Sequence, residues 1–539
     1  MIYTFIKRHL RFFTRTCPPA VVSGVLLTAA FPSIELAWIA WIALVPLLTA
    51  TSGVSLKQGL AAGFITGIIH YVTLLYWLVP TLARYGGLPV LGAVGLFLLL
   101  AGYLALYIGT FGMIMAGLDG CPAFRVLAAP VAWTGLEYLR ASLFTGFPWE
   151  LAGYSQYKTI PLIQIADITG VYGVSFLVVF ANAVAAYLLQ SSSGRHCLLK
   201  SGSWKKTISL VALFVAVSGS AWTYGTWRLK AIRPVLEQAP KIKVAVLQGN
   251  IPQDHKWNNA FRVATVEKYI NLSRLAAGLR PDLIVMPETA MPFYFLYDRQ
   301  GTSAVLNCAR ETGAWLLVGA PAAVTGNTTK FYNSAYLVTP EGETAGRYDK
   351  AHLVPFGEYV PLGPLRRFLP FIEKLVMGAV GDFSPGKHGK TLDMGNSRLG
   401  VQICYEIIFP GESRCAVKNG AMLLANITND AWYGKSSAPY QHFSMVVFRA
   451  IETRRSVVRA ANTGISGFIE PTGAVRGTTQ IFVETLETGN MPLLDSQTFY
   501  SMHGDIFAGV CTMGLFCILW YIYRFVDGQP LKKHRTIKS

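Results

Sequence analysis

Charged residues are scarce in this sequence, making up only 14% of its 539 positions. A soluble protein of this length would carry roughly a quarter. The shortage is uneven: residues 1–227 hold 13 Lys/Arg and 5 Asp/Glu between long apolar runs, whereas residues 228–500 hold 29 and 22. We therefore expect a membrane part followed by a soluble part, and the second is long enough for one domain with its own core.

Several binding patterns are also missing from the soluble part. It has no run of Lys/Arg interleaved with aromatic residues, so the net charge of +18 does not indicate nucleic-acid binding. It has no Cys-x-x-Cys or Cys/His spacing that would suggest a metal. Of the eight cysteines, only Cys308, Cys404 and Cys415 lie there. A Cys308–Cys415 disulfide is an open alternative in an oxidising compartment, and the third cysteine is a candidate reactive thiol.

Long apolar stretches are what the first part has in abundance. A membrane-spanning helix needs about 20 apolar residues. Candidate spans cover residues 17–33, 35–51, 58–80, 88–116, 122–139, 161–190, 206–226 and 505–524. We expect a seven-helix membrane domain over 1–227, a catalytic domain over 228–503, and a C-terminal transmembrane helix with a basic tail over 504–539. Glu137 lies near the end of its span beside Arg140, where an interfacial ion pair is expected.

Basic residues in short loops predict the orientation, because they favour the cytoplasmic side. With the N-terminus inside, inner segments hold 15 Lys/Arg and the outer loops of the first seven spans hold three: Arg84, Arg140 and Lys158. This places the soluble domain on the outer face. The basic start and its apolar run lack a clean cleavage site, so we expect an uncleaved signal anchor.

The soluble domain alternates strand-like and helix-like segments. Short apolar runs at 241–247, 282–286, 314–318, 398–403 and 421–426 predict strands, and 259–279 and 440–459 predict helices. Such alternation indicates an α/β sheet covered by helices.

Three segments carry residues suited to chemistry, two of them at strand ends, where α/β folds build their sites. They contain Glu288, Lys350 and Cys404. A catalytic cysteine reacts as the thiolate, so it needs a base or a positive neighbour. A carboxylate can take the thiol proton. A lysine can stabilise the oxyanion, together with the backbone N–H after the cysteine.

These segments resemble the Glu-Lys-Cys triad of the nitrilase superfamily: Pro287-Glu288, the Lys350–Glu358 run KAHLVPFGE, and Cys404-Tyr405-Glu406. Within it, the sequence is most similar to the apolipoprotein N-acyltransferase family. The resemblance extends to QGNIPQ at 248–253, YNS at 332–334, NDAWYG at 429–434, QHF at 441–443 and TGFPW at 145–149. It implies a multi-span membrane domain and an extracytoplasmic α-β-β-α sandwich, in the inner membrane of a bacterium with the catalytic domain on the periplasmic side.

The resemblance also implies a reaction. Cys404 would take a fatty acyl chain from a phospholipid as a thioester and pass it to the N-terminal amine of a diacylglyceryl-cysteine apolipoprotein, without cofactor or metal. Glu288 would be the proton acceptor and Lys350 the oxyanion stabiliser. Glu358 would orient Lys350, and Tyr405, Glu406, Trp257 and Asn333 would shape the site. His352 and His442 are interpreted as structural, because the site already has a base.

Two apolar segments near the triad could reach the lipid. Phe293 and Phe295 follow Glu288, and Leu369 and Leu375 follow Glu358. Aromatic and basic side chains together suit a lipid–water interface, so we expect lipid-facing arms; packing against the core is the alternative.

Two other function classes stay open. A tethered amidase or nitrile hydrolase would use the same triad with water as acceptor, but it would give no reason for seven spans. A non-catalytic scaffold or transporter would not need the complete triad.

Overall fold

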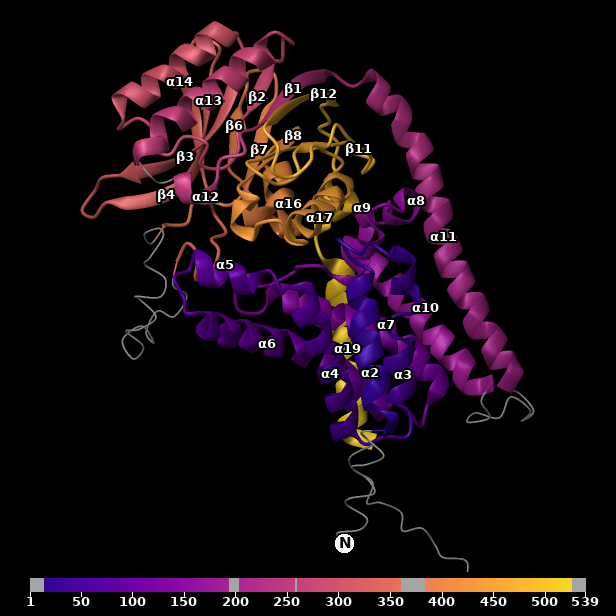
Figure 1. Cartoon of the computed structure of the whole chain (residues 1–539). Coiled ribbons are helices and arrows are strands. Elements are labelled where there is room, and N and C mark those ends of the chain that lie inside the picture. Colours follow the sequence, from indigo (N-terminus) through magenta and orange to yellow (C-terminus); the bar gives the residue numbers. More distant parts are fainter. Residues whose placement is uncertain (1–13, 193–202, 257–258, 360–382, 526–539) are drawn as a thin grey trace, which may run out of the picture.

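The computed structural model describes residues 14–192, 203–256, 259–359 and 383–525. They form a helical part and a two-sheet domain, and helix α11 (Ser203–Gln238) runs from the far end of the helical part up to the sheets (Figure 1). This helix continues eleven residues beyond the boundary expected at 227, and the chain leaves it at Ala239-Pro240.

The helical part is built mainly from long apolar helices and short breaks between them. In order it contains α2 (Cys17–Ala29), η1 (Ala37–Trp41), α3 (Val45–Ala50), α4 (Leu56–Leu74), α5 (Leu78–Arg84), α6 (Val90–Gly117), α7 (Pro122–Ser142), η2 (Ala152–Gln156), α8 (Ile160–Ile163), α9 (Ala166–Thr169), α10 (Val171–Ser192), α11 and, from the end of the chain, α19 (Ile506–Phe525).

Four helices in the described ranges are long and apolar enough to cross a membrane: α6, α10, α11 and α19. The pair α4–α5, bent by 56°, would make a fifth. On α6, Leu91 is 86% exposed and Leu99 72%, as expected for side chains that face lipid. The stretch 35–51 is not one helix, because η1 and α3 are separated at Ile42–Leu44 and Pro46 begins a new helix. The membrane character of this part is confirmed, whereas the count of seven spans stays a prediction.

Small residues let α4 and α6 pack closely. Gly59, Gly63 and Gly67 recur every fourth residue along α4. A Cβ at Gly63 would lie 2.1 Å from the carbonyl oxygen of Ile108, and one at Gly59 would lie 2.6 Å from that of Gly112. Backbones can approach this closely only where side chains are absent, which is the usual basis of helix pairing in membranes.

The soluble domain contains two six-stranded sheets packed face to face. Their strand orders are β12-β1-β2-β3-β4-β5 and β11-β10-β9-β8-β7-β6. The strands are β1 (Lys241–Gln248), β2 (Leu283–Val285), β3 (Trp315–Val324), β4 (Lys330–Val338), β5 (Thr344–Asp349), β6 (Thr391–Asp393), β7 (Arg398–Ile403), β8 (Leu423–Thr428), β9 (Ser456–Ala461), β10 (Gly467–Ile469), β11 (Val475–Arg476) and β12 (Thr485–Pro492).

Helices cover the outer faces of both sheets (Figure 1). α13 (Asn259–Ala277) and α14 (Arg299–Thr312) cover the first, and α16 (Pro410–Lys418) and α17 (Ala438–Thr453) the second. Short helices α12 (Gln253–Lys256), η4 (Cys404–Ile408), η5 (Asp430–Tyr433) and α18 (Phe499–His503) fill the connections. The predicted α-β-β-α sandwich is confirmed, and the β1, β2, β3, β7 and β8 regions were all predicted as strands.

The helix predicted over 440–459 was wrong at its end. α17 stops at Thr453, because Arg454 takes a left-handed conformation (φ +50°) that closes it, and β9 follows. Arg454 is held there by Asp167 of the helical part, whose carboxylate lies 2.6 Å from its Nη2.

The two parts share one continuous apolar core and several buried polar contacts. The core of the helical part extends into η4, α16 and α17. Gln441 of α17 is a buried node in this interface: its Oε1 accepts from the indole N–H groups of Trp77 (3.2 Å) and Trp149 (2.9 Å). Its Nε2 donates to the carbonyls of Pro32 and Leu74, both at 3.1 Å. The sheets are therefore fixed to the breaks between the membrane helices.

Candidate active site

The three predicted catalytic residues come together where the two sheets meet. Glu288 follows β2, Lys350 follows β5 and Cys404 follows β7, and all three line one cavity. Parallel strands β1, β2 and β3 of one sheet and β7, β8 and β9 of the other present their carboxyl ends here.

Two residues in the loops that carry Glu288 and Cys404 have strained backbone conformations. Cys404 has φ +54° and Thr289 has φ +51°, conformations that cost a non-glycine residue about 1–3 kcal/mol. Gly319 of β3 makes the Glu288 loop possible, since a Cβ there would lie 2.2 Å from the carbonyl oxygen of Pro287. The surrounding sheets hold Cys404 at a sharp turn between β7 and η4.

Asn333 joins the two carboxylates of the site. Its Nδ2 donates to Glu288 Oε1 (2.7 Å) and to Glu358 Oε1 (2.8 Å). Lys350 Nζ lies 2.8 Å from Glu358 Oε2 and 3.9 Å from Glu288 Oε1, with its side chain 1% exposed. Glu288 Oε2 accepts from the backbone N–H of Asn429 at 2.9 Å. Glu358 thus holds the ammonium and Glu288 keeps a lone pair toward the cavity.

The electrostatics suit a thiol that is activated only during reaction. Burial, and then the nearby Glu288 carboxylate, raise the pKa of the Cys404 thiol to about 12. Burial alone would lower the pKa of Lys350, but Glu358 and Glu288 raise it above its usual range, so the ammonium stays charged. A protonated thiol beside a carboxylate and a fixed cation is an arrangement for proton removal followed by attack.

Glu406 locks the lysine loop against the cysteine turn. Its Oε1 accepts from the Tyr348 hydroxyl (2.9 Å) and from the N–H groups of Ala351 (2.6 Å) and His352 (3.0 Å). Its Oε2 accepts from the N–H of Ile403 at 2.6 Å. Glu406 is fully buried and therefore supports the site without facing the cavity. Tyr405, in contrast, lines the cavity and reaches the carbonyl of Gly146 in the helical part at 3.5 Å.

Lys256 is a site residue that the sequence did not reveal. It is 2% exposed, lines the cavity, and its Nζ donates to the carbonyl of Glu288 at 2.7 Å. Burial lowers the pKa of Lys256 to about 8. The only sequence signal is its place next to Trp257, which lies outside the described residues.

The cavity, about 450 Å³, continues from the triad into the helical part. Its wall there is apolar and comes from α5, α6 and the loop after α7: Trp77, Leu78, Leu82, Leu96, Phe97, Leu100, Leu143 and Phe144. Phe144 is 88% exposed, so the wall reaches the outer surface of the helices. A cavity with this apolar wall, lined also by the Cys404 thiol, fits a substrate with a long hydrocarbon chain.

The prediction of a lipid-facing arm after Glu288 was wrong for two residues. Phe293 and Phe295 are 6% and 1% exposed and pack in the core between the first sheet and its helices. The segment alternates, so Tyr294 (42%) and Leu296 (53%) point outward instead. The other predicted arm residues, Leu369 and Leu375, lie outside the described residues.

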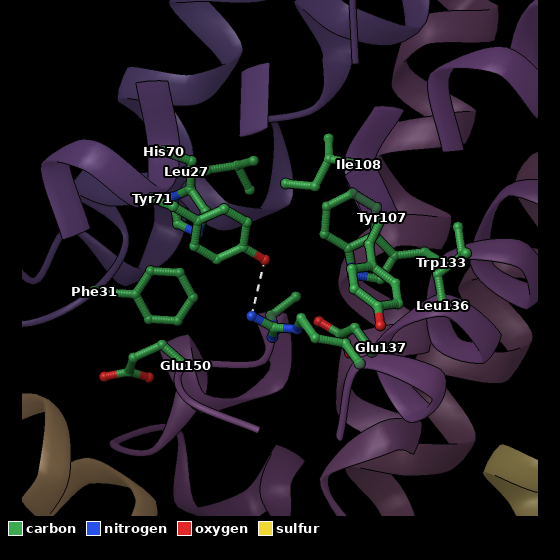
Figure 2. Close-up of a pocket in the computed structure, with 12 residues that line it drawn as sticks. Leu27, Phe31, His70, Tyr71, Tyr107, Ile108, Trp133, Leu136, Glu137 and Glu150 are labelled. Carbon is green, nitrogen blue, oxygen red and sulfur yellow. Dashed lines mark hydrogen bonds between the residues drawn. The ribbon is translucent and has the colours of Figure 1, made fainter. Parts of the chain in front are cut away.

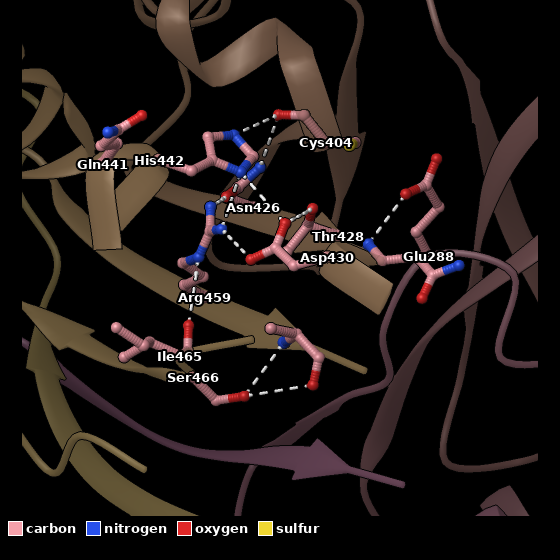
Figure 3. A network of polar contacts seen from close by, with 12 residues as sticks. Glu288, Cys404, Asn426, Thr428, Asp430, Gln441, His442, Arg459, Ile465 and Ser466 are labelled. Atoms are coloured by element: carbon pink, nitrogen blue, oxygen red, sulfur yellow. Dashed lines mark hydrogen bonds and ion pairs between the residues drawn. The ribbon is translucent and has the colours of Figure 1, made fainter. Parts of the chain in front are cut away.

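Behind Cys404 lies a buried polar network that includes His442 (Figure 3). His442 Nε2 lies 3.3 Å from the Cys404 carbonyl and Nδ1 lies 3.1 Å from Asp430. Asp430 in turn binds Arg459 at 2.9 Å. His352 packs instead on the ring of Phe409, with centroids 3.8 Å apart.

A second buried pocket lies inside the helical part (Figure 2). There Arg140 donates to the Tyr71 hydroxyl (2.8 Å) and the Trp149 carbonyl (3.3 Å). Glu137 accepts from the N–H of Ala152 (2.7 Å). The ion pair expected between Glu137 and Arg140 was therefore wrong: Arg140 donates to a hydroxyl and a carbonyl, whereas Glu137 accepts from a backbone N–H through Oε1 and its Oε2 has no hydrogen-bond partner among the described residues.

Cys308 and Cys415 are both free thiols, so the alternative disulfide is not formed. Within the described ranges, no group of three or more His, Cys, Asp or Glu side chains is arranged to hold a metal ion.

Comparisons with known proteins give two family matches. Residues 23–184 match the apolipoprotein N-acyltransferase N-terminal domain and residues 243–499 match carbon-nitrogen hydrolase. A protein named apolipoprotein N-acyltransferase from Geobacter metallireducens is 45% identical over 500 residues, which cover 92% of this chain and 93% of that one. Another of the same name from Methylococcus capsulatus is 36% identical over 493 residues, 90% of this chain and 92% of its own.

Proposed function

The chain belongs to the apolipoprotein N-acyltransferase family, and we propose that it transfers the acyl chain of a phospholipid in two steps through a thioester on Cys404. It is a membrane acyltransferase of lipoprotein maturation that uses the cysteine catalysis of the nitrilase superfamily. The donor, the roles of individual residues and the side of the membrane are the proposed parts.

In the first step, Glu288 takes the proton of the Cys404 thiol, and the sulfur attacks the ester carbonyl of the donor. Lys350 and the backbone N–H of Tyr405 stabilise the oxyanion. The C–O bond of the ester then breaks, and Glu288 returns the proton to the departing lysophospholipid oxygen. The acyl chain is left on Cys404 as a thioester.

In the second step, the free N-terminal amine of the diacylglyceryl-cysteine apolipoprotein attacks the thioester. Glu288 takes a proton from the amine as the C–N bond forms. The C–S bond breaks, and Cys404 recovers its proton. The amide product is more stable than the thioester, so the second step runs toward transfer.

The observation that carries the phospholipid donor is the apolar wall from α5, α6 and the loop after α7, which lines the same cavity as Cys404. An acyl chain lying there would place its ester carbonyl beside the thiol. A water-soluble amide would make no use of this wall, which counts against the tethered amidase.

We also propose that the catalytic domain faces the periplasm of a bacterial inner membrane. Lys57 and Arg125 lie in the first turns of α4 and α7. This is the end of the helices where α19 finishes, since Ile522 of α19 lies beside Gly117 at the end of α6. Basic residues at that end favour the cytoplasm. The division into residues 1–227, 228–503 and 504–539 belongs to this proposal, with α11 crossing the first boundary.

Intact mass spectrometry tests the donor. Purified protein is incubated with a phospholipid of defined acyl chains, beside Cys404→Ala. A mass increase of one acyl chain, absent in the variant and discharged by a lipopeptide with a free amine, is expected. Turnover of a soluble amide with water and no acyl adduct would support the amidase instead, and absence of both would favour the scaffold.

A further inference from the structure

The turn at Cys404 fixes the direction of one peptide plane. The Cys404 carbonyl and the Tyr405 N–H belong to the same peptide, which is planar and holds them pointing in opposite directions. The Tyr405 N–H is in the first turn of η4, where backbone N–H groups have no partner within the helix. Any group that holds the Cys404 carbonyl therefore aims this N–H toward the opposite side.

His442 is the nearest side-chain donor to that carbonyl. Its Nε2 lies at 3.3 Å, and Asn426 Nδ2 lies at 3.5 Å while also donating to the carbonyl of Gln402 at 3.0 Å (Figure 3). His442 is fully buried and does not line the catalytic cavity. His442 can therefore affect the reaction only through the peptide whose carbonyl it contacts.

The contact with the Cys404 carbonyl bears on which nitrogen of His442 carries the proton. Burial, and then the Arg459 guanidinium, lower the pKa of His442, so the ring is neutral and carries one N–H. Nδ1 lies 3.0 Å from Nη2 of Arg459, which can only donate. Nδ1 also lies 3.1 Å from Oδ1 of Asp430, which accepts, so Nδ1 has both a donor and an acceptor beside it. The Cys404 carbonyl, 3.3 Å from Nε2, can only accept, and this contact is a hydrogen bond when Nε2 carries the hydrogen.

The ring itself has no freedom to move. Arg459 is fixed by Asp430 at 2.9 Å, and Asp430 also accepts from the Thr428 hydroxyl at 3.0 Å. The indole of Trp149 from the helical part stacks on His442, with ring centroids 5.7 Å apart and an interplanar angle of 28°. Polar groups of the sandwich and an aromatic ring of the membrane part thus hold the imidazole.

We propose that His442 is a positioning residue that aims the oxyanion-stabilising N–H of Tyr405 by holding the Cys404 carbonyl through Nε2–H. The inference rests on the proposed function, because it assigns that N–H to the tetrahedral intermediate. It gives the QHF segment at 441–443 a role in the reaction rate in addition to packing.

Two substitutions separate this role from packing. In His442→Gln the side-chain amide reaches the place of Nε2, whereas in His442→Asn it reaches only the place of Nδ1, next to Asp430. Removing one oxyanion donor costs about 10²–10³ in kcat. We expect His442→Asn to slow acylation of Cys404 by about 10- to 100-fold with KM for the donor unchanged, and His442→Gln to stay within about threefold of wild type.

Acylation is followed by intact mass with a phospholipid and, in parallel, with 4-nitrophenyl hexanoate, which also needs the oxyanion hole. The matched control is Thr453→Val, which removes a buried bond to the carbonyl of Arg449 (2.7 Å) on the same helix. It should lower thermal stability without changing the acylation rate. If His442→Asn does not accumulate, His442→Phe replaces it, since it keeps a ring on Trp149 and has no N–H.

Equal rates for the Gln and Asn variants, or a faster Asn variant, with both donors would overturn the positioning role. Failure of the wild-type protein with the phospholipid alone would count against the proposed donor and leave the Gln–Asn comparison with the activated ester intact.

Discussion

Replacing Glu288 by Gln tests the proposed base directly. The carboxylate accepts from Asn333 through Oε1 and from the Asn429 N–H through Oε2, at 2.7 and 2.9 Å. Glutamine keeps one of these acceptors and sets an NH₂ against the other donor. The variant should therefore fold, with a loss of about 1–3 kcal/mol in stability.

The effect on rate follows from the state of the thiol. With a pKa of about 12, only about one Cys404 in ten thousand is a thiolate at pH 8 without help. A positioned general base accelerates a reaction by about 10²–10⁴-fold. We expect Glu288→Gln to acylate Cys404 at least about a hundred times more slowly. Its residual rate should rise about tenfold per pH unit between pH 7 and 9, because only preformed thiolate reacts.

The assay is the rate of acyl adduct formation by intact mass across that pH range. Glu412→Gln is the matched control, since Glu412 is buried, pairs with His388 at 2.7 Å and lies outside the cavity. A Glu288→Gln variant with more than a tenth of the wild-type rate, or with a flat pH profile, would refute the assignment of Glu288 as the base.

Three further predictions concern other parts of the structure. Asn333→Leu should slow acylation about 10- to 100-fold in the same assay while Lys350 stays buried, because both carboxylates lose their shared donor; an unchanged rate would contradict it. Lys256→Met should be more stable than wild type at pH 7 and melt at a higher temperature. Its free energy of unfolding should exceed that of the wild type by up to about 3 kcal/mol. The advantage should shrink from pH 8 toward 10.5, since the wild type gains stability as its buried lysine loses the proton; a constant difference across thermal melts at several pH values would argue against this. Gly63→Leu should abolish the monodisperse size-exclusion peak in detergent, because its side chain would meet α6; a wild-type profile would show that this contact is dispensable.

The sequence contained enough to predict the architecture and the triad. The length of the apolar stretches separates the membrane part from the sandwich. The alternation of short apolar runs with segments of helical periodicity predicts the sheets and the helices that cover them. Glu288, Lys350 and Cys404 stand in distinctive local contexts, so they could be found without knowing the distances. Supporting roles for Asn333, Glu358 and Glu406 were predicted only through the resemblance, and the hydrogen bonds from Asn333 to Glu288 and Glu358 were not predicted.

What could not be predicted depends on tertiary packing. Nothing in the local sequence marks Lys256 as buried, because the carbonyl that its ammonium contacts belongs to Glu288, 32 residues further along the chain. Phe293 and Phe295 were misjudged because an apolar segment was interpreted as a surface, although their i, i+2 spacing matches one face of an extended chain. The bend between α4 and α5 depends on contacts with α17 that are distant in sequence.

The four hydrogen bonds between the Gln441 side chain and the membrane half have a consequence for building chimaeras of this enzyme. One amide pairs with two indoles and two carbonyls from separate turns of the membrane half. A catalytic half grafted from a relative would find these partners only if the relative's own membrane half holds the same groups in the same places. A mismatched graft would leave a buried amide unpaired, at about 1–3 kcal/mol for each missing partner. The two halves should thus be compatible as inherited pairs, and exchanges that carry residues 32–33, 74–77 and 149 along with α17 should assemble where simple domain swaps do not.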